Sequence, residues 1–107
     1  MDVYHYATKG VYAKGHPKGS GFLILADSEA SGGVVNSCPQ NVQEFRAQLV
    51  NAGTLQSKGG SKDMTFTEDV FCYTSSFAAC LVGGNSRNGL QSWRNAANEY
   101  LRDAGYE

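Results

Sequence analysis

The stretch from Phe71 to Trp93, FCYTSSFAACLVGGNSRNGLQSW, holds the clearest change of structural period in the chain. Residues 70–72 alternate as a strand does, and the hydroxyl run 74–76 then supplies candidate N-caps for a helix. That helix is predicted to be short, with small residues at 78 and 79 that let it lie close against a sheet. Its apolar face is formed at i, i+3 and i+4 by Phe77, Cys80 and Leu81.

A polar loop closes this stretch. Gly83-Gly84 ends the helix, Asn88-Gly89 favours a tight turn, and the only tryptophan, Trp93, follows. A helix start beside such a loop could hold an anion on its free N–H groups. The chemistry alone favours the simpler interpretation, in which Ser75 or Ser76 caps the helix and the turn reverses the chain.

The residues before this stretch predict a small sheet. Residues 3–14 are rich in tyrosine and β-branched side chains and are predicted as one strand that bends at Gly10. Residues 15–21 have turn composition but lack the lysine–hydroxyl pair and following helix of a phosphate loop, and His16 is expected to be exposed there. The apolar run 22–26 is predicted as the central strand. Further short strands are expected at 54–56, 64–66, 70–72 and 90–93, and residues 27–36 are expected to form a polar loop.

Two more helices are predicted, at 39–52 and 96–103. In the first, Pro39 lies in the first turn and Gly53 ends the helix, while Glu44 and Arg46 fall outside the apolar stripe and are expected in solvent. The apolar stripes are Val42, Phe45, Leu49 and Val50 in the first helix, and Ala97, Tyr100, Leu101 and Ala104 in the last. The predicted fold is α+β, with a small, mainly antiparallel sheet of about four to five short strands packed against two to three helices.

Length and composition fit one domain, residues 1–107, because the chain is long enough for a single core and 41% of its residues are hydrophobic. No apolar run approaches the roughly 20 residues of a membrane helix, and residues 1–10 lack a signal-peptide core. A cytoplasmic location is therefore expected. Cys38, Cys72 and Cys80 cannot all pair and have no CxxC spacing, which favours reduced thiols and no bound metal.

The net charge of −1 gives no argument for a nucleic-acid partner, but the charges are unevenly distributed. Residues 3–26 contain Lys9, Lys14 and Lys18 without an acid, and residues 70–98 contain Arg87 and Arg94 without an acid. If these two acid-free segments share a face, that face is modestly basic. Such gaps also arise by chance in a chain with 18% charged residues.

The spacing in the opening stretch is more specific than its chemistry. The pattern Ser76-x-Ala78-Ala79-x(4)-Gly84-x(3)-Asn88-Gly89-x(3)-Trp93 resembles the signature of a small uncharacterised bacterial and phage domain. That domain is often found at the C-terminus of GIY-YIG nuclease proteins and beside restriction-modification genes. Earlier segments fit as well, namely Ala13-Lys14-Gly15, Gly21-Phe22 with Ser28, and residues 49–55.

The chain departs from that family's pattern at a few positions. The family's proline is Ser75 here, and the aromatic residue after asparagine-glycine is Leu90. The second serine, the alanines and the spacing to the tryptophan remain. The resemblance implies an accessory module that helps restriction and methylation enzymes engage DNA, without catalysis of its own.

The first hypothesis is therefore a non-enzymatic, nucleic-acid-binding module in a restriction or nuclease context. Its contacts are expected in the two acid-free segments, with lysine and arginine on phosphates and an asparagine near the backbone or a base edge. The candidate residues are Lys14, Lys18, Arg87, Asn88 and Arg94.

The second hypothesis is a phage or mobile-element protein that binds and inhibits a host nuclease or defence protein through a protein–protein interface. Exposed tyrosines would anchor such an interface, because aromatic residues dominate interface energetics. The candidate anchors are Tyr4, Tyr6, Tyr12 and Tyr106.

An enzyme is the third hypothesis and the weakest. No nucleophile–base pair and no metal-ligand spacing is recognisable, so no catalytic residue, cofactor or small-molecule substrate is assigned.

Overall fold

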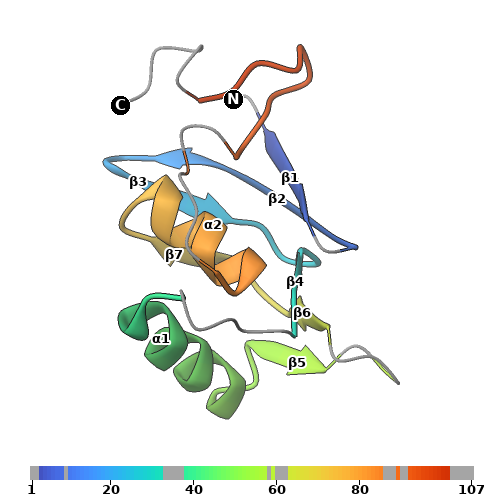
Figure 1. Cartoon of the computed structure of the whole chain (residues 1–107), viewed down its shortest axis with the longest axis vertical. Coiled ribbons are helices and arrows are strands. Elements are labelled where there is room, and N and C mark those ends of the chain that lie inside the picture. The colour runs from blue at the N-terminus through green and yellow to red at the C-terminus, as the bar shows by residue number, and fades with distance from the viewer. Residues whose placement is uncertain are drawn as a thin grey trace.

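The computed structural model describes residues 3–8, 10–32, 38–57, 59, 63–85, 89 and 92–101. Its elements, in chain order, are β1 (Tyr4–Thr8), β2 (Val11–Lys18), β3 (Gly21–Ile24), β4 (Glu29–Ala30), α1 (Gln40–Asn51), β5 (Leu55–Ser57), β6 (Met64–Phe66), β7 (Val70–Cys72) and α2 (Ser75–Gly83). The strands form two antiparallel sheets, in the orders β1-β2-β3-β7 and β4-β6-β5 (Figure 1). The α+β prediction is confirmed, with two described helices and with the strands divided between two sheets.

The first predicted strand is in fact a hairpin. Gly10 has φ of +79°, a left-handed conformation that reverses the chain, so β1 and β2 pair from Thr8↔Val11 to Tyr4↔Gly15. The predicted turn at 15–21 is also shorter than expected, because β2 continues to Lys18 and only Gly19 and Ser20 connect it to β3.

The third strand, β3, is central as predicted, and its buried residues lie between β2 and β7. On β2, Gly15 is required by close packing, since a Cβ there would lie 2.4 Å from the Phe22 ring and 2.5 Å from the carbonyl oxygen of Leu23. The short strand β4 was not predicted, because it lies in the polar stretch that reads as a loop.

The first helix begins after Pro39, which occupies the N-cap position, and it buries Val42, Arg46 and Leu49. The prediction that Arg46 is solvated is wrong: its side chain is 4% exposed. Residues 42, 46 and 49 lie at i, i+4 and i+7 and define the inner face, whereas Val50 lies at the border of that face and is exposed.

The second helix, α2, is built as its sequence predicts. The Thr74 hydroxyl accepts a hydrogen bond from the Phe77 N–H at 2.9 Å, and Gly84 ends the helix in the left-handed conformation. Ala78 and Ala79 are completely buried, which lets the helix approach β3, β4 and β7 closely.

Gly89 is bound to the start of α2. The Ser76 hydroxyl accepts a hydrogen bond from the Gly89 N–H at 2.9 Å. The expectation that Ser75 or Ser76 caps the helix is wrong, because Thr74 is the N-cap. A Cβ on Gly89 would lie 2.2 Å from the backbone of Ser75, which explains the glycine. The Ser-x-Ala-Ala to Trp spacing is therefore a packing motif.

The predicted last helix is wrong over its described residues, 96–101. Asn95 Oδ1 accepts hydrogen bonds from the N–H groups of Ala97 and Glu99, and Asn98 has φ of 65°. This asparagine-stabilised turn lets the chain return, so that the Leu101 N–H reaches the Trp93 carbonyl oxygen at 3.2 Å.

The tyrosines of β1 follow the alternation of the strand. Tyr4 and Tyr6 were expected as exposed anchors, but they point to the helix side and are buried in the core. Tyr12 is exposed, and Tyr106 lies outside the described residues. None of the helices among the described residues is long and apolar enough to cross a membrane.

All three cysteines are buried free thiols. Burial raises the pKa of the Cys72 thiol from 9.0 to about 12. Between these two pH values the Cys72 thiol is deprotonated in the unfolded chain but protonated in the folded chain. The free energy of unfolding therefore falls as the pH rises.

We therefore expect the free energy of unfolding to fall by up to roughly 1.4 kcal/mol per pH unit above about pH 9, through Cys72 alone. Urea unfolding of the wild type and of Cys72→Ala, from about pH 8 to about pH 10.5, measures this effect. All other titratable groups are common to the two proteins, so the difference between their curves isolates Cys72. Parallel curves for the two proteins would contradict it.

Candidate nucleic-acid interface

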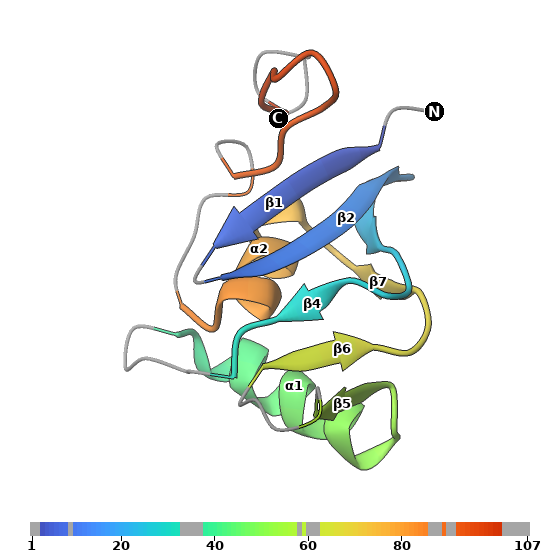
Figure 2. The same cartoon turned by 90° about the vertical axis from the view of Figure 1, so that its right-hand side faces the viewer.

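The face of the four-stranded sheet that points away from the helices carries basic and aromatic side chains. Figure 2 shows β1 and β2 in front, with α2 behind them. Along β2 the buried residues alternate with Tyr12, Lys14 and His16, and Lys18 continues the outward series. We call this surface the outer face.

A row of charged and polar side chains crosses the outer face at His5. His5 pairs with Lys14 of β2 on one side and with Arg94 on the other. The His5 N–H donates to the Arg94 carbonyl oxygen at 2.6 Å, and the Arg94 N–H donates to the His5 carbonyl oxygen at 2.9 Å. Residues directly opposite in such pairs have Cα atoms about 4.5–5.5 Å apart and project to the same face. Arg94, His5 and Lys14 are therefore neighbours, although 89 positions separate His5 from Arg94.

The guanidinium of Arg94 is held by neutral groups. It donates to Asn98 Oδ1 at 3.1 Å and to the Tyr100 hydroxyl, and its Cζ lies 4.6 Å from the centre of the Tyr100 ring. No carboxylate among the described residues pairs with it or with Lys14. Its charge is thus oriented but not neutralised within this part of the chain.

The backbone of Lys14 is fixed by a buried serine. The Ser28 hydroxyl accepts from the Lys14 N–H at 2.9 Å and donates to the Lys14 carbonyl oxygen at 3.1 Å. Beside it, the Tyr12 hydroxyl hydrogen-bonds to Nδ1 of His5, and the two rings lie 5.5 Å apart. Hydrogen bonds therefore hold the Lys14 backbone and the His5 side chain in place.

A polar depression of about 440 Å³ lies at this end of the sheet. It is lined by side chains of β1 and β2 and by the returning segment 92–100, among them His5, Tyr12, Arg94, Asn98 and Tyr100. One acidic group borders the outer face, since Glu29 Oε1 accepts from the Tyr12 N–H at 2.9 Å. The electrostatics of the surface are therefore basic along the row and acidic at its β4 border.

Of the predicted contact residues, Lys14, Lys18 and Arg94 lie on the outer face. Arg87 and Asn88 lie outside the described residues. His16 was expected in an exposed turn, but it is half-buried on β2, with Nδ1 hydrogen-bonded to the Pro17 carbonyl oxygen at 3.0 Å.

The sequence interpretation missed His5, Tyr12 and Tyr100 as parts of this surface. The β1–β2 hairpin brings His5 and Tyr12 together, and the pairing of His5 with Arg94 adds Tyr100. The second pairing has no local sequence signal. Over the part of the chain that the structure describes, no three His, Cys, Asp or Glu side chains form a group that could hold a metal ion.

Comparison with known proteins adds a family but no activity. The family model described as Domain of unknown function (DUF4357) matches residues 4–105. No curated protein and no solved structure matches the chain.

Proposed function

The chain belongs to the family described as Domain of unknown function (DUF4357), and since that membership names no activity, we propose from the geometry that it is a nucleic-acid-binding module. The observation that carries the proposal is the cross-strand row of Arg94, His5 and Lys14 on the outer face. Two permanent cations without a described carboxylate partner are suited to phosphate oxygens.

The other residues of the outer face extend this interaction. Lys18 lies four residues beyond Lys14 on β2, which is about 13 Å along a strand, so a bound nucleic acid would follow β2. The Tyr12 side chain is 45% exposed next to the row and offers a ring on which a base can stack. A sheet surface with an exposed aromatic ring favours single-stranded over duplex nucleic acid.

The module acts in this proposal as an accessory without catalysis. The described residues of the outer face include no carboxylate pair or metal group that would cleave a phosphodiester. A restriction or nuclease context rests on the resemblance of the Ser76-to-Trp93 spacing alone.

A fluorescence titration with labelled single-stranded and duplex DNA, at low and at physiological salt, tests the proposal. We expect tighter binding to the single strand, weakened by salt, because phosphate contacts release counterions. Lys14→Gln and Arg94→Gln should each weaken binding several-fold and lower the magnitude of the salt slope by about 0.7.

The control is Gln48→Glu, which changes the net charge as Lys14→Gln does, but on an exposed position of α1. It should leave the salt slope unchanged. Absence of binding to either DNA at low salt, or equal effects of Lys14→Gln and Gln48→Glu, would reject the outer face as the interface.

A second candidate function is binding to a protein, such as a nuclease or a defence protein. The observation that favours it is a pair of exposed aromatic side chains at β7, Phe71 at 52% and Tyr73 at 59% exposure. Such rings are typical anchors of protein interfaces.

A further inference from the structure

The strand β7 is an edge of its sheet, and its register leaves the Phe71 backbone unpaired. The Leu25 N–H donates to the Lys14 carbonyl oxygen at 2.9 Å. In antiparallel strands every second residue directs its N–H and C=O to the same neighbour, so this bond shows which residues of β3 face β2. Leu23, two residues before Leu25, therefore directs its N–H and C=O to β2, whereas Phe22 and Ile24 direct theirs to β7.

The same alternation sets the direction of the groups on β7. Cys72 and Val70, which pair with Phe22 and Ile24, point their N–H and C=O groups to β3. Phe71, opposite Leu23, points its N–H and C=O away from the sheet. No other described residue hydrogen-bonds to these two groups. The edge thus presents one donor and one acceptor to an incoming strand.

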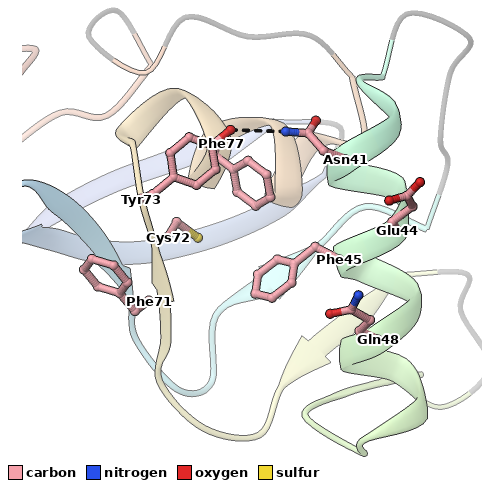
Figure 3. Close-up of a pocket in the computed structure, with 8 residues that line it drawn as sticks. All are labelled: Asn41, Glu44, Phe45, Gln48, Phe71, Cys72, Tyr73 and Phe77. Atoms are coloured by element: carbon pink, nitrogen blue, oxygen red, sulfur yellow. Dashed lines mark hydrogen bonds between the residues drawn. The ribbon is translucent and has the colours of Figure 1, made fainter.

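A groove lies beside this edge, and α1 forms its far wall (Figure 3). We call it the β7 groove. Its volume is about 380 Å³, and it is lined by Asn41, Glu44, Phe45, Gln48, Phe71, Cys72, Tyr73 and Phe77.

The floor of the β7 groove is aromatic. The centre of the Phe77 ring lies 5.5 Å from the centre of the Phe45 ring and 4.8 Å from that of the Tyr73 ring. Asn41 Nδ2 donates to the Tyr73 hydroxyl at 3.1 Å, which holds Tyr73 against α1 while the ring stays exposed. The floor is therefore formed before any ligand arrives.

The Phe71 side chain does not block the edge. A Cβ added to Gly21 would lie 2.5 Å from Cζ of Phe71, so the ring lies over the β3 backbone at Gly21. Figure 3 shows the ring turned away from α1. The Phe71 N–H and C=O consequently face the β7 groove, while the Phe71 side chain points away from it.

We propose that the β7 groove binds an extended peptide segment of a partner protein, which adds to the sheet as a strand beside β7. One peptide residue exchanges two backbone hydrogen bonds with Phe71, and a large apolar side chain of the peptide packs on Phe45, Tyr73 and Phe77. Glu44 on α1 has no cationic partner among the described residues, so a lysine or arginine of the peptide pairs with it.

The shape of the β7 groove favours a single peptide over a second copy of the chain. A strand added to β7 would lie about 4.8 Å from it, on the side of the β7 groove. The sheet of a second copy would meet α1, which stands beyond the free edge of β7.

Selection from a displayed library of random dodecapeptides against the full chain tests this proposal. We expect enriched peptides with apolar residues at alternate positions and a basic residue toward one end. An enriched peptide, made synthetically, should shift the amide NMR signals of residues 70–73 and 77. N-methylation of its amide that pairs with Phe71 should weaken binding at least about tenfold, because it removes the strand hydrogen bond but no side chain.

Variants of the protein provide the second measurement. Phe71→Pro removes the outward N–H at an edge position where proline is tolerated, and it should abolish binding. Phe71→Thr also removes the ring but keeps the N–H, so it should retain the binding that Phe71→Pro loses. If Phe71→Pro does not fold, the N-methylated peptide still decides the matter.

Three outcomes would overturn the proposal. The selection could enrich no peptide, or the enriched peptides could keep their affinity after N-methylation. The chain could also dimerise in sedimentation, with residues 70–73 protected from hydrogen exchange, in which case a second copy occupies the edge. DNA binding by the outer face is measured separately, so its failure and the failure of peptide binding are distinguishable.

Discussion

Replacement of Trp93 by alanine is expected to lower the free energy of unfolding by about 3–5 kcal/mol. The indole is completely buried. Its ring centre lies 4.4 Å from the ring centre of Phe22 and 5.5 Å from that of Tyr6. Its Nε1–H donates to the Ser75 carbonyl oxygen at 3.1 Å. The substitution therefore opens a cavity between sheet and helix and removes the side-chain hydrogen bond that the Ser75 carbonyl oxygen accepts.

Urea and thermal unfolding, followed by far-UV circular dichroism, measure the effect. Trp93→Phe is the matched control, because it keeps an aromatic ring in the core and removes only the N–H and part of the volume. It should lower the free energy of unfolding by about 1–3 kcal/mol, for the lost hydrogen bond to Ser75 and the smaller ring. A loss below about 1 kcal/mol for Trp93→Ala would mean that the segment after α2 does not contribute to the core.

Local signals in the sequence predicted the parts of the fold that local chemistry determines. The hydroxyl run before Phe77 and the glycine at 84 correctly placed both ends of α2. The sequence did not reveal that Ser76 would bind Gly89, because that contact spans 13 positions and has no local signal. The motif could be recognised by its spacing, whereas its physical role required the structure.

The candidate interface was only partly predictable, for a related reason. The two acid-free segments supplied Lys14 and Arg94, but their proximity depends on the pairing of β1 with a segment near the end of the described chain. The same segment was mistaken for a helix, because its alanines and Leu101 fit a helical stripe. The side chain of Asn95 instead binds two N–H groups and turns the chain back, which puts Tyr100 on Arg94.

The two proposed surfaces use different strands of one sheet. The row proposed to bind phosphate crosses β1 and β2, whereas the β7 groove lies at the opposite edge, beyond β3. A partner peptide on β7 would therefore leave Lys14 and Arg94 accessible. One small domain could in this way join a nucleic acid to a protein, which is the task of an accessory module.

Replacement of Arg46 by methionine is expected to lower the free energy of unfolding by about 2–4 kcal/mol. Arg46 connects three elements: its Nη1 donates to the Leu81 carbonyl oxygen at 2.5 Å, and its Nη2 donates to the carbonyl oxygen of Ser31. Leu81 is in the last turn of α2, where carbonyl groups have no partner within the helix, and Ser31 follows β4.

The sign of the Arg46 effect depends on two opposing terms. Burial lowers the pKa of the Arg46 guanidinium, while Cys38 raises it, so the charge is kept at a desolvation cost that methionine would remove. Methionine has a similar stem but no donor, and two buried carbonyl oxygens would lose charged partners. Because each such hydrogen bond contributes about 1.5–3 kcal/mol, the loss of both exceeds the relief from desolvation.

Urea unfolding of Arg46→Met and of Gln48→Ala measures the contribution of Arg46. Gln48 lies on the same helix but is exposed, and its replacement should change stability by less than about 0.5 kcal/mol. Arg46→Lys should also destabilise the fold, because an ammonium group lacks the planar fork that reaches two carbonyl groups at once. A methionine variant as stable as the wild type would contradict the prediction, because it would show that the relief from desolvation cancels the loss of both hydrogen bonds.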